Sequence, residues 1–139
     1  MSTTPGQPVE ARFPAEVLSR LEAEEEVDIE TRRPDGRIRS TIVWVMVEDG
    51  RAYLRSVRGP EGRWYQEARA EPRAVIVTGG RRIAVRCVHA PDPASVAACS
   101  DALRRKYRSD PSLRAMLARD VLATTLRLEP RDAGEARGS

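Results

Sequence analysis

Two segments of the sequence combine arginine with hydroxyl side chains beside the expected ends of strands. One segment leads into the apolar run 41–47, and the other follows the next apolar run and ends at a glycine. Guanidinium groups, hydroxyl groups and the backbone amides beside a glycine all donate hydrogen bonds to phosphate oxygens. These residues therefore predict a clamp for a phosphate group. They are Arg39, Ser40, Thr41, Arg55, Ser56, Arg58 and Gly59.

Ordinary surface arginine is the alternative interpretation of the same residues. Arginine supplies nearly all of the 24 basic residues, because Lys106 is the only lysine. The chain has neither the GxxxxGK[ST] phosphate loop nor the GxGxxG dinucleotide fingerprint. The residues alone therefore leave both interpretations open.

Basic and acidic residues are distributed unevenly along the chain. The first 30 residues carry two basic and eight acidic side chains, whereas the remainder carries 22 basic and 13 acidic ones. The later part should therefore attract anions. Nucleic acid is the least favoured partner, since aromatic residues make up only 4% of the chain and stacking platforms are scarce.

Histidine and cysteine are too few for the common metal sites and catalytic triads. His89 is the only histidine, and Cys87 and Cys99 form no CxxC pair. A two-histidine metal site or a histidine-based triad would need a second chain. We therefore expect no metal, two buried reduced thiols, and His89 as a side chain at a strand end.

Length and composition predict one domain over residues 13–130. A chain of 139 residues can bury a continuous core without disulfides or metal. A flexible N-terminus, residues 1–12, and a disordered polar tail, residues 131–139, are expected beside it. The sequence shows neither a bilayer-spanning apolar stretch nor a signal-peptide pattern, so we expect no membrane partner and a cytoplasmic location.

Hydrophobic periodicity changes along the chain from helical to strand-like and back. The strongest local signal is Gly79-Gly80 between two β-branched runs, which favours a hairpin turn. The expected helices cover residues 14–25, 93–108 and 112–120, and the expected strands cover 27–32, 38–47, 52–57, the two arms of 74–88, and 123–130.

The run 41–47 is apolar at both alternating sets of positions, so neither face of this strand should meet water. In a small closed sheet, one face fills the barrel and the other needs a cover. A second copy of the chain is the favoured cover. A helix of the same chain is an alternative that the sequence leaves open.

The order of motifs over residues 25–130 resembles the split-barrel flavoproteins. The resemblance is greatest to the deazaflavin-dependent nitroreductase-like branch and its uncharacterised small-protein relatives, and residues 102–130 are similar to the latter. In that branch a short helix follows a Trp-Tyr pair and ends before proline. The matching positions are Gly36, Arg39, Thr41, Trp44, Gly50, Ser56, Gly59, Trp64, Tyr65 and Pro72.

This resemblance implies an α+β, mainly β fold: a six-stranded antiparallel split β-barrel with one N-terminal helix and two helices near the C-terminus. It also implies a homodimer that binds FMN, or a deazaflavin coenzyme instead, in a groove at the subunit boundary. The clamp residues would hold the cofactor phosphate, while Trp64 and Tyr65 would shape the ring pocket. No catalytic residue is assigned.

The leading functional hypothesis is an oxidoreductase that transfers hydride between this cofactor and a small-molecule substrate. The alternative is a cofactor-free split-barrel protein that acts as a non-redox enzyme or binds a small ligand. Gln66-Glu67 motivates the alternative, because this pair replaces the His-Asn that often follows Trp-Tyr in the family. Glu67 itself is expected to be exposed.

Overall fold

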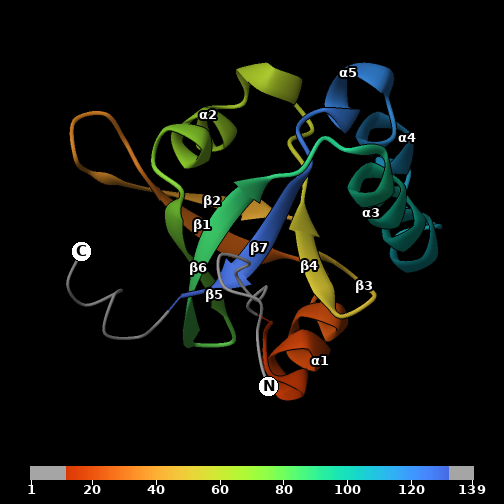
Figure 1. Cartoon of the computed structure of the whole chain (residues 1–139), viewed down its shortest axis with the longest axis horizontal. Coiled ribbons are helices and arrows are strands. Elements are labelled where there is room, and N and C mark those ends of the chain that lie inside the picture. The colour runs from red at the N-terminus through yellow and green to blue at the C-terminus, as the bar shows by residue number, and fades with distance from the viewer. Residues whose placement is uncertain (1–11, 132–139) are drawn as a thin grey trace, which may run out of the picture.

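The fold is a strongly curved antiparallel sheet with helices packed around it (Figure 1). The computed structural model describes residues 12–131. Its seven strands lie in the order β2-β1-β5-β6-β7-β4-β3, and every neighbouring pair is antiparallel. The strands are β1 (Val27–Arg32), β2 (Ile38–Val43), β3 (Met46–Glu48), β4 (Arg51–Leu54), β5 (Arg73–Thr78), β6 (Arg81–His89) and β7 (Leu126–Pro130).

The predicted strand 38–47 is in fact two strands, which corrects the expected number from six to seven. The chain leaves β2 at Trp44 and Val45 and continues as β3. These two strands are the opposite edges of the sheet. Because only two residues join them, the sheet must curl until its edges approach each other. The break is therefore the point at which the barrel closes.

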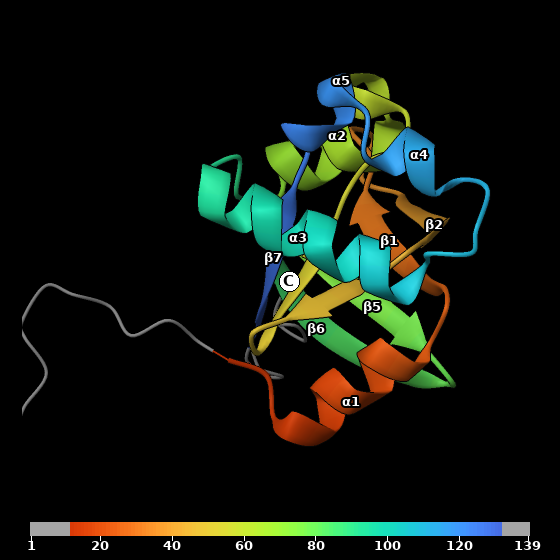
Figure 2. The ribbon, with the colours of Figure 1, turned by 90° about the vertical axis from the view of Figure 1, so that its right-hand side faces the viewer.

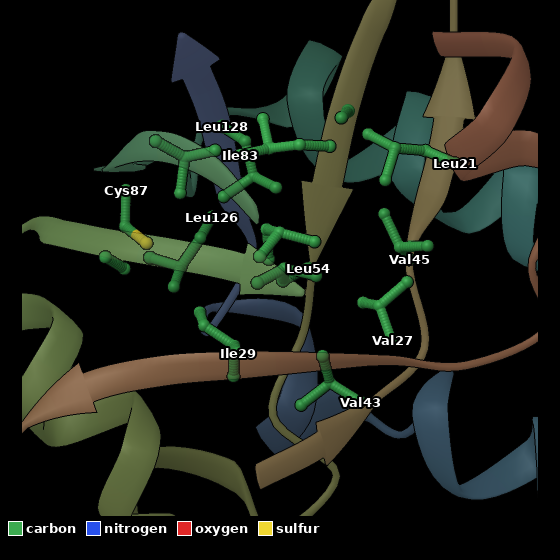
Figure 3. Packing of buried hydrophobic residues seen from close by; sticks show 14 of the residues in the cluster. Leu21, Val27, Ile29, Val43, Val45, Leu54, Ile83, Cys87, Leu126 and Leu128 are labelled. Carbon is green, nitrogen blue, oxygen red and sulfur yellow. The ribbon is translucent and has the colours of Figure 1, made fainter. Parts of the chain in front are cut away.

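The barrel interior holds the main hydrophobic core (Figure 3). Val27, Ile29 and Val43 point inward from β1 and β2, and Leu126 and Leu128 point inward from β7. Leu21 reaches the same core from α1. The alternation of buried and half-buried residues along β5 and β6 is the expected pattern for strands with one face in a core.

The helices cover the barrel at opposite ends, with α1 at one end and α2 and α5 at the other (Figures 1 and 2). The predicted helix 112–120 is two short helices, because the chain is extended at Ala118. The helices are α1 (Ala15–Ala23), α2 (Arg63–Ala70), α3 (Pro93–Lys106), α4 (Leu113–Met116) and α5 (Arg119–Leu122), with the 3₁₀ turn η1 (Gly59–Glu61) before α2.

A helix of the same chain, one of the two covers predicted for the doubly apolar run, packs on part of it. Helix α3 packs on the outer side of the β3 half, where Met46 joins a second cluster with Leu103 and Tyr107. No helix among residues 12–131 covers the outer side of the β2 half, and Ile42 is 65% exposed. The helix of the same chain therefore covers one half of the run and leaves the other open.

The predicted N-terminus and tail, residues 1–12 and 131–139, lie outside the described residues except for Arg12 and Arg131. Arg131 is attached to the sheet. Its backbone N–H donates to the carbonyl of Ala84, and its guanidinium donates to the carbonyls of Val85 and Ala74. Arg131 is thus held against β5 and β6.

Candidate functional site

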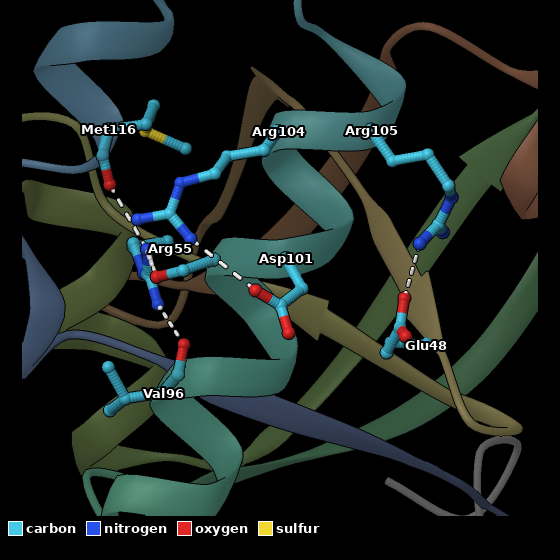
Figure 4. Close-up of polar contacts among 8 residues, drawn as sticks. Glu48, Arg55, Val96, Asp101, Arg104, Arg105 and Met116 are labelled. Atoms are coloured by element: carbon cyan, nitrogen blue, oxygen red, sulfur yellow. Dashed lines mark hydrogen bonds and ion pairs between the residues drawn. The ribbon is translucent and has the colours of Figure 1, made fainter.

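Arg55 is the most deeply buried charged side chain of the predicted clamp, at 2% exposure. It lies just after β4, between α3 and α4 (Figure 4). Its Nε donates to Thr125 Oγ1 at 3.0 Å, and Nη1 donates to Ser100 Oγ and to the Met116 carbonyl, both at 3.1 Å. Nη2 donates to the Val96 carbonyl at 3.1 Å. All four acceptors are neutral.

This arrangement leaves the Arg55 charge without a carboxylate partner among residues 12–131. Burial lowers the pKa of Arg55, and the positive charge of Arg104 lowers it further. Arginine nevertheless stays protonated in proteins, because its ordinary pKa is far above neutral. A buried cation without a counter-ion is costly, so Arg55 would stabilise a ligand group that carries or takes up negative charge in the cavity beside it.

Arg55 lines a cavity of about 300 Å³ that we name the tryptophan pocket. Trp44 comes from the strand break and Trp64 from the first turn of α2, so two distant segments supply the aromatic walls. The exposed side chains Ile42 and Val57 also line it. The complete lining is Glu26, Thr41, Ile42, Val43, Trp44, Arg55, Val57, Arg58, Trp64, Ser112 and Met116.

Ser56 and Gly59 shape the turn before α2 and do not line the tryptophan pocket. The Ser56 hydroxyl donates to the Gly59 carbonyl at 2.8 Å, and the Ser56 N–H donates to Thr124 Oγ1 at 3.0 Å. Gly59 has φ +71°, which other residues rarely adopt, and a Cβ at Gly62 would collide with Ser56 Oγ. The backbone thus requires glycine at position 59, and the Ser56 side chain leaves no room for a Cβ at position 62.

Arg39 lies in a second cavity, of about 580 Å³, that we name the arginine groove. Its Nε lies 2.9 Å from both carboxylate oxygens of Glu67 on α2, and Thr31 donates its hydroxyl to the same carboxylate at 2.8 Å. Glu67 is therefore buried, which corrects the expectation that it is exposed. The groove is lined by Arg32, Arg33, Pro34, Arg39, Arg63, Gln66, Glu67, Ala70 and Glu71.

The arginine groove keeps an excess of positive charge after its ion pairs are counted. Arg39 balances Glu67, and Arg73 binds Glu71 so closely that the pKa of Glu71 falls to about 2. Arg63 has no partner in the part of the chain that the structure describes. Neither terminal nitrogen of Arg39 has a partner there, so both are available to an anion.

The two cavities are neighbours. Arg39 and Thr41 lie on the same face of β2, two residues and therefore about 7 Å apart. Helix α2 supplies Trp64 to one cavity and Arg63 to the other. The predicted single clamp is thus divided: Thr41, Arg55 and Arg58 line the tryptophan pocket, whereas Arg39 lies in the arginine groove.

Two other predicted site residues lie outside both cavities. Ser40 is exposed on the outer face of β2. Tyr65 is buried, with its ring edge-on to Trp64 and its hydroxyl accepting a hydrogen bond from Arg69 at 2.9 Å. Of the predicted pair, Trp64 alone therefore lines the tryptophan pocket.

Two residues of the site were missed or misjudged at the sequence level. Trp44, which was not among the predicted site residues, both stacks on Tyr107 and lines the tryptophan pocket. Arg63 was not considered, although it immediately precedes the Trp-Tyr pair. The glycine-rich turn before it was the only available signal.

The predicted thiols and histidine have the expected structural positions. Cys87 and Cys99 are free and buried. His89 ends β6, and its Nε2 lies 2.8 Å from the Ala123 carbonyl. Residues 12–131 contain no group of three potential metal ligands, and no helix among them is long and apolar enough to cross a membrane.

Comparison with known protein families identifies the family of this chain. Residues 17–128 match the family described as "Uncharacterized protein conserved in bacteria (DUF2255)". The chain belongs to this family. The match spans most of the DUF2255 chain and agrees with the predicted resemblance to uncharacterised small proteins. No curated protein matches it.

Solved structures show which fold the DUF2255 chain shares. The conserved hypothetical protein Rv2991 from Mycobacterium tuberculosis has a TM-score of 0.61 at 18% identity, covering 93% of this chain and 87% of that one. An F420 reductase has a TM-score of 0.54 at 18% identity, covering 86% and 97%. A candidate pyridoxamine 5′-phosphate oxidase from Listeria innocua has a TM-score of 0.56 at 14% identity, covering 84% and 92%.

These likenesses support the predicted architecture, a mainly β antiparallel barrel of the split type with flanking helices. The identities are too low to carry more than the fold. The chemistry of the DUF2255 chain has to be argued from its own two cavities.

Proposed function

We propose that the protein binds a flavin-type cofactor, FMN or a deazaflavin coenzyme, and transfers hydride between it and a small-molecule substrate. The observation that carries this proposal is the buried Arg55 charge beside a cavity with two tryptophan walls. When bound, the cofactor supplies the redox chemistry, and the protein supplies binding and electrostatics.

The tryptophan pocket fits the ring of such a cofactor. Trp44 and Trp64 offer aromatic surface to a flat conjugated ring, which gains most by packing against other rings. The Arg55 guanidinium favours a ring that takes up electrons, because a nearby positive charge stabilises the negative charge that the ring gains. Thr41 and Arg58 add hydrogen-bond donors.

The arginine groove fits the anionic tail of the same cofactor. FMN and the deazaflavin coenzyme both carry a phosphate on a chain attached to the ring. The terminal nitrogens of Arg39 and the side chain of Arg63 are available donors, and the groove adjoins the tryptophan pocket through β2 and α2. In this proposal the predicted clamp holds both ends of one elongated ligand.

We further propose that a second copy of the chain completes the site. Ile38, Ile42 and Val57 are each more than half exposed, and the latter two line the tryptophan pocket. A volume of about 300 Å³ is at the lower limit for a cofactor pocket. A partner seated on these side chains would bury them and enlarge the enclosed volume.

The test is a binding titration of FMN and of a deazaflavin coenzyme, alongside the absorbance spectrum of the purified protein. Arg58→Gln should weaken cofactor binding roughly tenfold, because it removes one charged hydrogen-bond donor. Arg82→Gln is the matched control, since Arg82 is an exposed arginine that pairs with Glu30 and lines neither cavity. Equal affinities of the two variants would remove the tryptophan pocket as the binding site.

One observation favours the second candidate, a cofactor-free protein that binds another small ligand. Glu67 already engages Nε of Arg39, so the groove holds a carboxylate of its own. A smaller anion could then bind the remaining donors. Thermal stabilisation by another small anion, with neither cofactor bound, would favour this candidate.

A further inference from the structure

Glu67 is a buried carboxylate that faces Arg39 in the arginine groove. The residue is 7% exposed, so its side chain has little freedom to rotate. Thr31 Oγ1 donates to Glu67 Oε1 at 2.8 Å, and Thr31 is paired directly with Arg39 across β1 and β2. Two strands and α2 therefore hold this carboxylate in one place.

The carboxylate occupies one edge of the Arg39 guanidinium. Nε of Arg39 lies 2.9 Å from both Glu67 oxygens, whereas the two terminal nitrogens have no partner within residues 12–131. A guanidinium is planar, so fixing the direction of its Nε–H also fixes the direction of the terminal nitrogens. The Arg39 side chain is 25% exposed, and the groove reaches it. Arg39 thus presents a fork of N–H donors whose direction Glu67 determines.

Arg63 borders the same part of the groove. It precedes Glu67 by four residues on α2, and residues at that spacing are neighbours on one face of a helix. Arg63 is exposed and lines the groove together with Arg39. A second guanidinium therefore stands beside the Arg39 fork.

Glu67 has two opposite effects on an anion in this groove. Its negative charge repels the anion, and this effect alone would weaken binding. Its contact with Arg39 orders a long side chain in advance, and the cost of ordering such a side chain on binding lowers affinity by roughly fivefold. The carboxylate lies at Nε and the anion would lie at the terminal nitrogens, so the guanidinium separates the two negative charges. We therefore expect the ordering to outweigh the repulsion.

We propose that Glu67 is a positioning residue of the arginine groove, which directs the Arg39 fork toward two oxygens of one phosphate group. This inference rests on the proposed function, because the phosphate is that of the cofactor. It gives the Glu67 side chain a part in ligand binding at a position where this sequence departs from the family pattern. Lysine cannot replace Arg39 in this role, because one ammonium group cannot both engage Glu67 and present a fork.

The experiment measures the dissociation constant of inorganic phosphate by NMR titration of the full-length protein. Glu67→Met and Glu67→Gln remove the same charge, but only glutamine keeps an oxygen that accepts from Arg39 Nε. We expect Glu67→Met to weaken phosphate binding roughly fivefold, and Glu67→Gln to match or exceed the wild-type affinity. Binding by Glu67→Met as tight as that by Glu67→Gln would overturn the proposal.

Glu71→Gln is the matched control for charge. It removes a carboxylate from the same groove, but Glu71 pairs with Arg73 instead of Arg39. Repulsion alone predicts tighter phosphate binding in this variant and in both Glu67 variants, whereas positioning predicts weaker binding in Glu67→Met only. The sign of the Glu67→Met effect therefore separates the two explanations.

The wild-type protein gives a second measurement that needs no stable variant. The Nε–H of Arg39 should exchange with solvent at least about tenfold more slowly than that of the exposed Arg63, because the Glu67 contact protects it. Equal exchange rates would overturn the proposal. Failure of the proposed function has a different signature: phosphate would still bind in the manner described, while neither FMN nor a deazaflavin coenzyme binds.

Discussion

The indole of Trp44 stacks face to face on the ring of Tyr107, with centroids 3.9 Å apart and planes 2° apart. This contact joins the break between β2 and β3 to the end of α3. The Tyr107 hydroxyl also donates to the Glu25 carbonyl at 2.6 Å. Because Trp44 lines the tryptophan pocket, the packing of α3 determines the position of one wall of the proposed site.

Tyr107→Ala should lower the free energy of unfolding by about 3–5 kcal/mol, the usual cost of removing a buried aromatic side chain. Tyr107→Phe keeps the stack and should cost about 1 kcal/mol for the lost hydroxyl bond. Chemical denaturation measures both values. Arg108→Ala, at an exposed neighbour, is the control and should change stability by less than about 0.5 kcal/mol. A Tyr107→Ala cost as small as that of the control would contradict the packing role.

Local turn chemistry and periodicity made part of the fold predictable. Gly79 and Gly80 have φ +56° and +80°, as a hairpin turn between β5 and β6 needs. This signal lies within the feature that it determines. Periodicity likewise predicted α1 and α3.

The break between β2 and β3 had no comparable signal. Trp44 and Val45 are as apolar as their neighbours, so the local sequence does not mark the break. The chain changes from one sheet edge to the other there only because the barrel closes. The burial and hydrogen-bond partners of the arginines also depend on residues that are distant in the sequence. Arg55 resembles Arg58 in the sequence, but its acceptors Ser100 and Thr125 lie 45 and 70 residues away. Tyr107 is likewise buried by residues far from it in the sequence, Trp44 and Glu25.

Arg39→Ala should lower the free energy of unfolding by roughly 3 kcal/mol, because it leaves the buried Glu67 carboxylate without its cation. Glu67→Gln should cost less, since the amide oxygen still accepts from Thr31 and Arg39 is itself partly exposed. A double-mutant cycle in urea measures the coupling between the two side chains. Independent, additive effects would show that the ion pair is unimportant to the fold.

The thiols of Cys87 and Cys99 should resist alkylation at pH 8. Burial raises the pKa of Cys87 to about 12 and that of Cys99 to about 11, from the ordinary 9.0, against the smaller effects of Arg131 and Arg55. Iodoacetamide should therefore react at least about a hundredfold more slowly with the folded chain than with the chain in urea. Similar rates in the two states would mean that the thiols are accessible.

The same thiols should make stability depend on pH. Between pH 9 and 11 the unfolded chain loses thiol protons that the folded chain keeps, so this contribution lowers the free energy of unfolding as pH rises. The double variant Cys87→Ala with Cys99→Ala should lack this part of the pH dependence. An unchanged slope in the double variant would assign it to other groups.

Ile42→Asp should convert the proposed dimer into a monomer. Ile42 is 65% exposed on the uncovered half of the doubly apolar run, and a charge there cannot be buried against a second copy without a partner. Light scattering coupled to size exclusion measures the mass. Ser40→Asp, on the same strand face, tests whether the interface extends along β2. A wild-type protein that stays monomeric at high concentration would contradict the dimer.

Intrinsic fluorescence offers the most direct test of the proposed cofactor site, because the only two tryptophans of the chain, Trp44 and Trp64, both line the tryptophan pocket. Trp44→Phe and Trp64→Phe each leave a single reporter on one wall. We expect FMN or a deazaflavin coenzyme to quench both reporters with the same dissociation constant, and Arg58→Gln to raise that constant about tenfold. Unquenched fluorescence in both variants, at cofactor concentrations that saturate other flavoproteins, would contradict the proposed site.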